Sequence, residues 1–247
     1  MFSGFRKLLL FFLFALLLSG CGDPSTDIKK AVTALTETGI PLQSDPAGNV
    51  RWIEAKNGEL NDKTMRYLPA LKELEWLEIG KGNLSGKGLK YLEKCTALKR
   101  LYIHDMDLKG EDLSWISSLN KLEALALQNT KIDGSFLKDI SCIETLRVLN
   151  LSGNNISDED MPQIALIKNL EVLSLADTNI SGTGIQALQR MARLNELNVE
   201  RCIIRDYDLS YFMTMPNLRI VYATGSEMDE MAINRVISQF PSLAIFR

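Results

Sequence analysis

The sequence predicts an α/β solenoid, a coil of repeated units that each contribute one short strand and one short helical segment. The first observation is a period of 24 residues in the aliphatic side chains, which is typical of repeat architectures. The repeating residues are Val50, Leu74, Leu98, Leu122, Leu146, Leu170, Leu194 and Leu218, with Leu243 following after 25 residues. The second observation is that three further aliphatic positions keep the same spacing, at the fourth, sixth and eleventh places of each unit. With 46% hydrophobic residues among 247, the chain can bury the continuous core that such a coil requires.

Each unit changes its hydrophobic period along its length. The fourth and sixth places alternate with polar or small neighbours, which predicts a strand with one buried face. Later in the unit the apolar residues stand three apart, as in Met161, Ile164 and Ile167, which predicts a helical turn against the same core. Pro69 and Pro162 within these segments indicate that the helices are short. Polar residues that can act as N-caps precede them: Asn61, Ser85, Asp133, Ser157, Ser181 and Asp229.

Two units carry a motif that resembles a known family. Residues 146–156 read Leu-Arg-Val-Leu-Asn-Leu-Ser-Gly-Asn-Asn-Ile, and residues 170–180 repeat the pattern. This is similar to the core of a bacterial leucine-rich repeat. The resemblance covers residues 50–247 as eight units plus a partial ninth. It implies a horseshoe with parallel strands on the concave face and short helices on the convex face.

The resemblance also implies a row of inward polar side chains at the ninth place. Later units keep it, with Thr130, Asn154, Thr178, Cys202 and Ser226. The first three units have Gly58, Gly82 and Met106 there, which offer no side-chain amide to the loop backbone. We therefore expect less regular turns in those three units.

The two ends of the coil differ. Residues 27–49 predict an N-terminal cap, with a helix over 27–38 that ends at Gly39, then a short strand and a turn over 44–49 that lead into Val50. At the other end the last partial strand, residues 243–247, leaves an apolar edge. Such an edge makes self-association through the C-terminal edge a hypothesis.

The N-terminus reads as a targeting segment. Arg6 and Lys7 precede an apolar run over residues 8–18, which would rise about 16 Å as a helix and is too short to span a bilayer. The run ends in Leu-Ser-Gly before Cys21, which resembles the lipobox of bacterial lipoproteins. The resemblance implies a lipoprotein signal peptide over 1–20, removed before Cys21 receives lipid such as palmitate, and a tether over 21–26. The alternative is an ordinary or uncleaved signal peptide, with Cys21 unmodified.

A lipidated Cys21 would place the protein in the bacterial cell envelope. Attachment of two or three acyl chains gives stable membrane anchoring without a spanning helix. The anchor would lie in the outer membrane or on the outer face of the cytoplasmic membrane. Within the resemblance, Gly22 favours the outer membrane, whereas Asp23 leaves the choice open.

Composition excludes several functions. Lys and Arg total 28 against 31 Asp and Glu, so no basic excess is present to bind nucleic acid. One histidine and four scattered cysteines supply too few ligands for a metal site, and no cofactor is expected. Cys95, Cys142 and Cys202 are expected to be buried free thiols, because two units of the coil separate Cys95 from Cys142.

The resemblance implies that the third, fifth, seventh and eighth places point out from the concave sheet. The first three units place there the residues that we predict to bind a protein or peptide: Trp52, Glu54, Trp76, Glu78, Arg100, Tyr102, His104 and Asp105. Tryptophan, tyrosine and arginine are enriched among residues that carry interface energy. The competing interpretation is that Trp52 and Trp76 only cover the joint with the cap, against Leu42 or the turn before Val50.

Catalysis is not expected. His104 beside Asp105 is the one imidazole in the chain, and the repeat does not bring a serine or cysteine nucleophile to it. The sequence therefore predicts a membrane-anchored, non-enzymatic protein-binding module. An architectural, self-associating envelope protein without a specific ligand is the alternative, and a hydrolase is a remote one.

Overall fold

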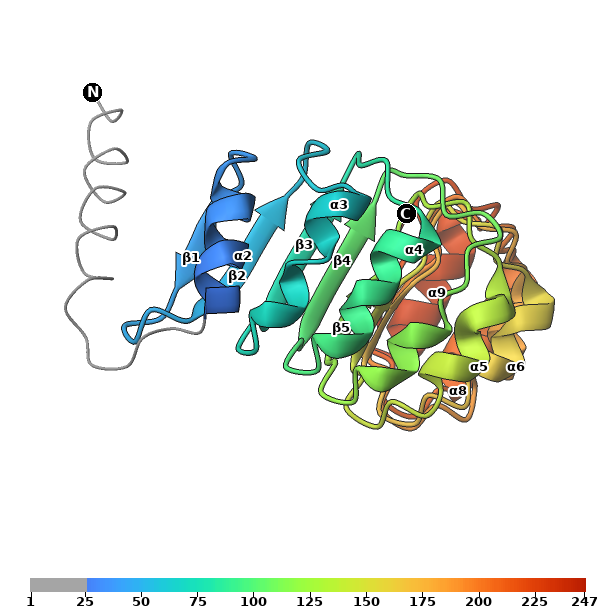
Figure 1. Ribbon diagram of the computed structural model, residues 1–247. Coiled ribbons are helices and arrows are strands. Elements are labelled where there is room, and N and C mark those ends of the chain that lie inside the picture. Colours follow the sequence, from blue (N-terminus) through green and yellow to red (C-terminus); the bar gives the residue numbers. More distant parts are fainter. Residues whose placement is uncertain (1–25) are drawn as a thin grey trace, which may run out of the picture.

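The described part of the chain is a curved coil in which strands and helices occupy opposite sides. The computed structural model describes residues 26–247. The predicted signal peptide, Cys21 and nearly all of the predicted tether lie outside these residues. Figure 1 shows helices α2, α3 and α4 in front of the first strands, and the later coils bending round behind them. The α/β solenoid predicted from the 24-residue period is confirmed.

The strands form one sheet in sequence order. Their bounds are β1 (Leu42–Ser44), β2 (Val50–Ala55), β3 (Trp76–Gly80), β4 (Arg100–His104), β5 (Ala124–Ala126), β6 (Val148–Asn150), β7 (Val172–Ser174), β8 (Glu196–Asn198), β9 (Ile220–Tyr222) and β10 (Ala244–Phe246). β1 runs antiparallel to β2, and each later pair is parallel. In every parallel pair the partners in the register stand 24 positions apart, as Leu149 and Leu173 do. The sequence period therefore becomes the register of the sheet.

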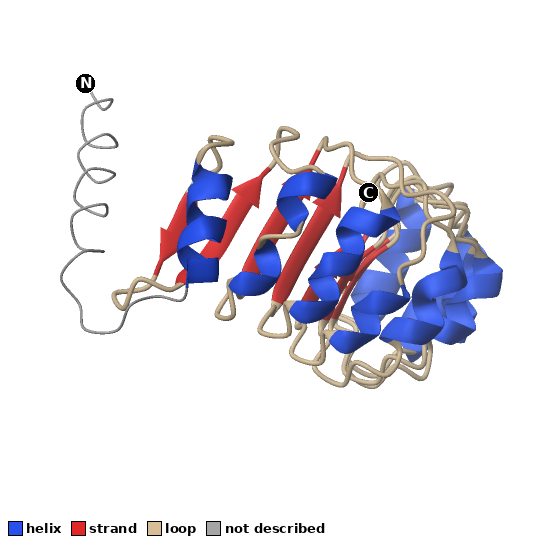
Figure 2. Ribbon diagram, viewed as in Figure 1, coloured by secondary structure: helices blue, strands red, loops and turns tan. Residues whose placement is uncertain are grey.

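The helical segments lie on the outer side of the curve (Figure 2). The α-helices are α2 (Thr26–Thr36), α3 (Asp62–Met65), α4 (Gly86–Leu89), α5 (Leu137–Ile140), α6 (Met161–Ile164), α7 (Gly182–Ala187), α8 (Leu209–Thr214) and α9 (Glu230–Gln239). The 3-10 segments are η1 (Leu68–Ala70), η2 (Lys90–Lys94), η3 (Ser114–Ser118), η4 (Gly134–Phe136), η5 (Asp158–Asp160) and η6 (Asp206–Asp208). Pro69 and Pro162 stand in the first turn of η1 and α6, where a missing N–H costs no helical hydrogen bond.

The recurring aliphatic side chains form one continuous core between the strands and the helices. Leu101, Leu125, Leu149 and Leu173, at the fourth place of successive units, have no exposed surface. The first, sixth and eleventh places are also buried in every complete unit. This stacked spine is the element that the sequence predicted most directly.

The inward polar row follows the prediction in the later coils. Asn154 is buried and its Oδ1 accepts hydrogen bonds from the backbone N–H of Thr130, at 3.0 Å, and of Ile132, at 3.3 Å. Its amide donates to the carbonyls of Leu127 and Leu151, at 2.6 and 2.9 Å. A single side chain thus satisfies loop groups of two coils.

The irregular turns expected in the first three units are found in all three. Later coils are joined after the turn by single β-bridges, such as Asp133 with Asn155, and the bridges among the described residues include none from Ser85 or Lys109 in the second and third units. From Lys81 and Asp105 onward, a left-handed residue stands at the eighth place, and its N–H donates to the next coil, as Lys81 does to the carbonyl of His104. In the first unit Gly58 adopts this conformation one place later, with φ +81°. The second and third units keep this backbone bond at the eighth place but lack the β-bridge that follows it in later coils, and the third unit adds a further left-handed residue, Gly110, with φ +74°.

The cap lies against the first coil. Ala31 and Leu35 of α2 are fully buried, and β1 pairs with the outer edge of β2. The connecting turn is held by Asp45, whose carboxylate accepts from the N–H groups of Ala47 and Asn49 and from Arg51. These bonds, above all those from Asn49, lower the pKa of Asp45 from its ordinary 3.8 to about 2.

The prediction for the cysteines was right at two positions and wrong at one. Cys95 and Cys202 are buried free thiols, and burial raises the pKa of Cys95 to about 12. Cys142 is exposed. Cys142 stands one place earlier in its unit than Cys95 does. The inward position that Cys95 occupies is held by Ile143 in the unit of Cys142.

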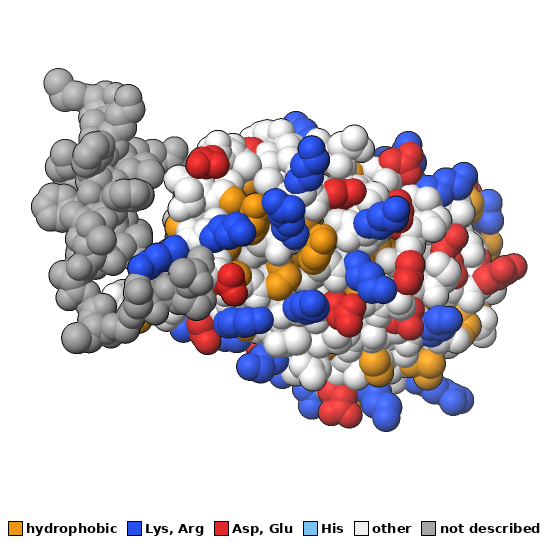
Figure 3. Space-filling view, viewed as in Figure 1, with side chains coloured by type: hydrophobic (Ala, Val, Ile, Leu, Met, Phe, Trp, Pro, Cys, Tyr) orange, Lys and Arg blue, Asp and Glu red, His pale blue; other side chains and the backbone are white. Residues whose placement is uncertain are grey.

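No helix among residues 26–247 has the length and hydrophobicity needed to cross a bilayer. The helix side carries Lys and Arg interspersed with Asp and Glu, and its hydrophobic side chains form only small areas (Figure 3). The face in view therefore presents no large continuous apolar patch.

Candidate protein-binding surface

Strands β2, β3 and β4 bring the predicted binding residues together on the concave face. In the parallel register, Trp52 stands opposite Trp76, and Trp76 opposite Arg100. Two residues further along, Glu54 faces Glu78 and Glu78 faces Tyr102. His104 ends β4 and Asp105 follows it directly. The eight residues therefore form one surface.

Three aromatic rings make a column across these strands, which we call the aromatic column (Trp52, Trp76 and Tyr102). The rings of Trp52 and Trp76 are stacked, with centroids 3.7 Å apart and planes 9° from parallel. Tyr102 leans on Trp76 at 4.9 Å and 42°. The guanidinium of Arg100 lies 5.4 Å from the centroid of Trp76, a cation–π arrangement. Each of the three side chains is half-buried. The packed part orders the rings, and the exposed part presents an aromatic surface to solvent.

The indole N–H groups of the two tryptophans differ. Nε1 of Trp52 donates to Oε1 of Glu54 at 3.0 Å. Nε1 of Trp76 is buried and has no acceptor among the described residues. Burying a donor without a partner costs free energy, so packing of the column itself must hold Trp76 in place.

Carboxylates border the column on the side of the strand ends. Nζ of Lys56 lies 3.0 Å from Oε2 of Glu78 and 3.5 Å from Oε2 of Glu54. The hydrogen bond to Glu78 raises the pKa of Lys56. Lys56 thus keeps two neighbouring carboxylates together on adjacent strands, where they would otherwise repel.

His104 is held between two carboxylates. Its Nε2 lies 3.3 Å from Oε1 of Glu78, and its Nδ1 lies 3.0 Å from Oδ2 of Asp105. A hydrogen bond from Asn129 and the contact with His104 lower the pKa of Asp105. No serine or cysteine is among the hydrogen-bond partners of His104 in residues 26–247, so this geometry offers no activated nucleophile.

Gly80 leaves room for the imidazole ring of His104. A Cβ built on Gly80 would lie 2.4 Å from Cε1 of His104 and 2.8 Å from the carbonyl oxygen of Lys56. Only glycine lets the ring lie over the β3 backbone at this point. Gly80 and Lys56 are not among the residues predicted from the sequence, although Lys56 stands at the seventh place, which the repeat directs outward.

The concave surface changes character at β5. Ala124 and Ala126 follow Arg100 and Tyr102 in the register, and each is only 5% exposed. Further along, polar side chains reappear: Ser152, two residues after β6, and Ser174, at the end of β7, share a hydrogen bond of 2.8 Å. The aromatic column is therefore bounded, with β1 on one side and a floor of small residues on the other.

Both interpretations of the tryptophans remain compatible with this placement. β1 does border the column, with Gln43 opposite Trp52. Leu42, against which the tryptophans would pack if they only covered the cap, pairs with Ile53 instead. The rings stack on one another. A variant that removes them without unfolding the chain distinguishes a binding surface from a cover over the cap.

Among residues 26–247 no group of three or more His, Cys, Asp or Glu side chains is placed so that it could hold a metal ion.

Comparisons with known proteins identify the repeat. A family model described as "Leucine Rich repeat" matches residues 143–162 and 167–188. No curated protein sequence matches the chain. Among solved structures, internalin C2 from Listeria monocytogenes is similar with a TM-score of 0.61 and 21% identity, over 90% of this chain and 92% of that one. A leucine-rich-repeat protein from Leptospira interrogans is similar with a TM-score of 0.56 and 17% identity, over 74% of this chain and 51% of that one.

These likenesses establish the fold as a leucine-rich-repeat solenoid of the kind seen in bacterial proteins, with parallel concave strands and short convex helices. The solenoid is typical of scaffolds for protein interaction. The fold by itself does not determine the partner, because the site is built from the outward side chains.

Proposed function

We propose that this chain is a non-enzymatic protein-binding module that takes a protein or peptide on the concave face of its first three coils. The observation that carries the proposal is the aromatic column, a stack of Trp52, Trp76 and Tyr102 that is half-exposed and bounded by charged groups. Preordered aromatic rings bury large area on binding at little cost in side-chain entropy.

The charged groups around the column would orient the bound partner. Glu54, Glu78 and Asp105 lie beside it with Lys56 and Arg100, so both signs are available to a partner. A central aromatic anchor within a polar rim is the usual arrangement of a protein interface. The eight residues predicted from the sequence, together with Lys56, are the proposed contact set.

The experiment is photocrosslinking in the cell that makes the protein. A photoreactive amino acid in place of Gln43, which is exposed and opposite Trp52 at the end of the column, should form a discrete crosslinked product. The matched control has the same amino acid in place of Gln163, which is exposed on the helix side in α6, and should give none. A product at Gln163 and none at Gln43 would contradict the proposal.

We also propose that Cys21 carries lipid and holds the protein on a membrane of the bacterial cell envelope. The support is the sequence before Cys21, which resembles a lipobox, and a coil that can work next to a membrane without a spanning helix. Metabolic labelling with an alkyne palmitate should tag the wild-type protein and leave C21S untagged. A C142S variant, which removes an exposed thiol elsewhere, should keep the label. Equal labelling of wild type and C21S would refute the anchor.

Self-association through the C-terminal edge is the second candidate. It is favoured by β10, where Phe246 is 51% exposed and stacks on Tyr222 at 5.4 Å. Light scattering of the full chain at high concentration tests it. A monomer throughout the concentration series would exclude self-association and leave the concave-face proposal standing.

A further inference from the structure

The charge of the helix side changes along the coil. From its twelfth place to its end, each unit passes through its helical segment and returns toward the next strand. In the first two units, residues 61–73 and 85–97, this part holds six basic residues against three acidic ones: Lys63, Arg66, Lys72, Lys87, Lys90 and Lys94 against Asp62, Glu73 and Glu93. The same part of the other six complete units holds eight basic residues against twelve acidic ones. The basic surplus therefore belongs to the end of the coil that follows the cap.

The repeat aligns four of these cations in two rows. Lys63 and Lys87 stand 24 residues apart, and so do Arg66 and Lys90. They lie in or directly after α3 and α4, which contact each other. Figure 3 shows Lys and Arg side chains over these two helices. We call this surface the basic patch (Lys63, Arg66, Lys87 and Lys90).

The cations of the basic patch are not neutralised within the protein. The side chains of Lys63, Lys87 and Lys90 form no hydrogen bond or ion pair among residues 26–247, and all three residues are exposed. Arg66 contacts a tyrosine instead of a carboxylate, because its Nη2 donates to the hydroxyl of Tyr67 at 2.8 Å. The positive charge is therefore free to act on a partner outside the coil.

Two of the three acidic residues of these units are occupied elsewhere. The carboxylate of Asp62 accepts from the N–H and the hydroxyl of Ser85, at 2.9 and 2.6 Å. Glu73 lies 3.1 Å from Nη1 of Arg51, on the side where the strands begin. Acidic residues of the third unit mark the border of the patch, with Glu111 against Gly86 and Asp112 near Lys90.

Tyrosines accompany the two basic rows. Tyr67 and Tyr91 also stand 24 residues apart, each directly after a cation of the second row. The guanidinium of Arg66 lies 4.8 Å from the centroid of the Tyr67 ring, and Tyr91 is 39% exposed. Tyrosine beside Lys and Arg is typical of a surface at the boundary between lipid and water, because its ring is apolar at one end and polar at the other.

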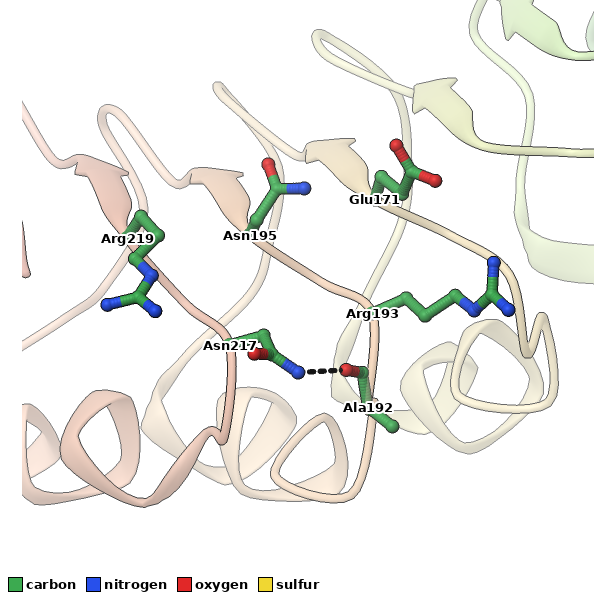
Figure 4. A pocket seen from close by; sticks show the side chains of 6 residues that line it. All are labelled: Glu171, Ala192, Arg193, Asn195, Asn217 and Arg219. Atoms are coloured by element: carbon green, nitrogen blue, oxygen red, sulfur yellow. Dashed lines mark hydrogen bonds between the residues drawn. The ribbon is translucent and has the colours of Figure 1, made fainter.

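The later cations of the helix side form no comparable surface. Among the later units only the sixth has a basic surplus in this part, from Arg190 and Arg193. The neighbouring units have neutral residues at these places: Leu166, Asn169, Thr214 and Asn217. In Figure 4, Arg193 and Arg219 lie on opposite sides of a hollow that Glu171 also lines. A continuous basic surface is therefore confined to the first two units.

The cap brings the basic patch close to the proposed lipid anchor. Helix α2 begins at Thr26 and contacts η1 of the first unit. The five residues from Cys21 to the start of α2 can reach at most about 17 Å when fully extended. Lipid on Cys21 would therefore hold the first coils at the surface of the membrane.

We propose that the basic patch lies on the anionic phospholipid headgroups of the membrane that holds the anchor. The proposal rests on the lipidation of Cys21 proposed above. A basic surface adds to the attachment that acyl chains give, and it acts within about 8–10 Å of anionic lipid. The strands lie on the opposite side of the coil (Figure 2), so this orientation turns the aromatic column away from the bilayer and toward a partner.

The test is lysine footprinting of the protein purified from its own membranes and placed on vesicles. The vesicles contain either phosphatidylcholine alone or phosphatidylcholine with an equal amount of phosphatidylglycerol. A water-soluble acetylating reagent should modify Lys87 and Lys90 about tenfold more slowly on the anionic vesicles, the factor expected from about two lysines at an anionic surface. Lys168, exposed in the fifth unit, should react equally on both. High salt should remove the protection without releasing the protein.

Two variants with the same change of charge give the matched comparison. In K87E/K90E, Lys63 should react on anionic vesicles nearly as fast as on neutral ones. In K138E/K168E, which alters exposed lysines of the fourth and fifth units, Lys87 and Lys90 should stay protected. Thermal unfolding of each variant shows that the fold is intact.

Flotation of the wild type with the vesicles separates this proposal from that of the anchor. Flotation with both kinds of vesicle and equal reactivity of Lys87 on both would overturn the basic patch and leave the anchor standing. Flotation with anionic vesicles only would refute the anchor and support the basic patch. Flotation with neither would refute both.

Discussion

Trp52 and Trp76, 24 residues apart in the chain, stack with ring centroids 3.7 Å apart because the repeat places them opposite each other on β2 and β3. The period therefore does two things at once. It drives the aliphatic spine into the core, and it aligns whatever side chains occupy the outward places. A continuous aromatic surface forms wherever the outward places of consecutive units hold aromatic residues, as they do in Trp52, Trp76 and Tyr102.

The stack should be measurable as a coupling energy. Trp52→Ala, Trp76→Ala and the double variant form a double-mutant cycle, in which the two rings should show a coupling of about 0.5–1.5 kcal/mol. Urea unfolding at equilibrium gives the free energies. Strictly additive effects would mean that the rings do not stabilise each other.

Asn154 should be the most sensitive polar residue of the coil. Asn154→Ala leaves the N–H of Thr130 and the carbonyl of Leu151 without this partner, and the carbonyl of Leu127 keeps only the hydroxyl of Thr130. We expect a loss of about 3 kcal/mol in the free energy of unfolding, since each buried unpaired group costs about 1–3 kcal/mol. The matched control is Asn155→Ala, an exposed neighbour, which should change stability by less than about 0.5 kcal/mol. Similar losses in the two variants would contradict this account.

The three described cysteines should react differently with a thiol reagent. Cys142 is exposed and should be labelled in the native protein, whereas Cys95 and Cys202 should react only after unfolding. Burial raises the pKa of both buried thiols, which lowers their reactivity further. Mass spectrometry of labelled peptides identifies the sites. In C142S, native labelling at these three positions should vanish, and rapid labelling of Cys95 would show that its coil opens.

Asp45 should make the stability of the cap depend on pH. Its pKa is about 2 in the folded chain against an ordinary value of 3.8, chiefly through hydrogen bonds from Asn49. A lowered pKa means that the carboxylate stabilises the fold above about pH 4 and that this contribution is lost as the pH falls towards about 2. Asp45→Asn should therefore be less stable than wild type at neutral pH and equal to it near pH 2. Urea unfolding across this range checks the prediction, and a constant difference between the two proteins would refute it.

The sequence predicted the parts of the fold that follow from periodicity. The burial of Leu149 and its pairing with Leu173 both follow from a spacing that can be counted. Capping was less predictable. Ser85 stands before α4 as expected, but its hydroxyl binds Asp62 of the preceding coil at 2.6 Å instead of capping its own helix. Contacts between coils compete with local ones, and a single unit does not reveal them.

The candidate surface was predictable in position and not in geometry. The outward places gave Trp76, Tyr102 and His104, but not the tilt of the rings or the seat that Gly80 leaves for the imidazole. Cys142 shows how sensitive such predictions are to position. It was expected to be buried, but it stands one place before the inward position and is exposed. A place in the repeat fixes the side of the coil that a residue faces, and packing of neighbouring side chains fixes the rest.

The most direct test of the account replaces Trp76, Arg100 and Tyr102 together by alanine and measures partner capture from envelope extracts beside the thermal unfolding transition. We predict that a stoichiometric partner captured by the wild type is lost while the transition stays in place. The matched variant with Glu196, Asn198 and Tyr222 replaced by alanine, on the same face at β8 and β9, should keep the partner. Full capture by the first variant, or its failure to fold, would contradict a recognition role and leave the tryptophans as a cover for the cap.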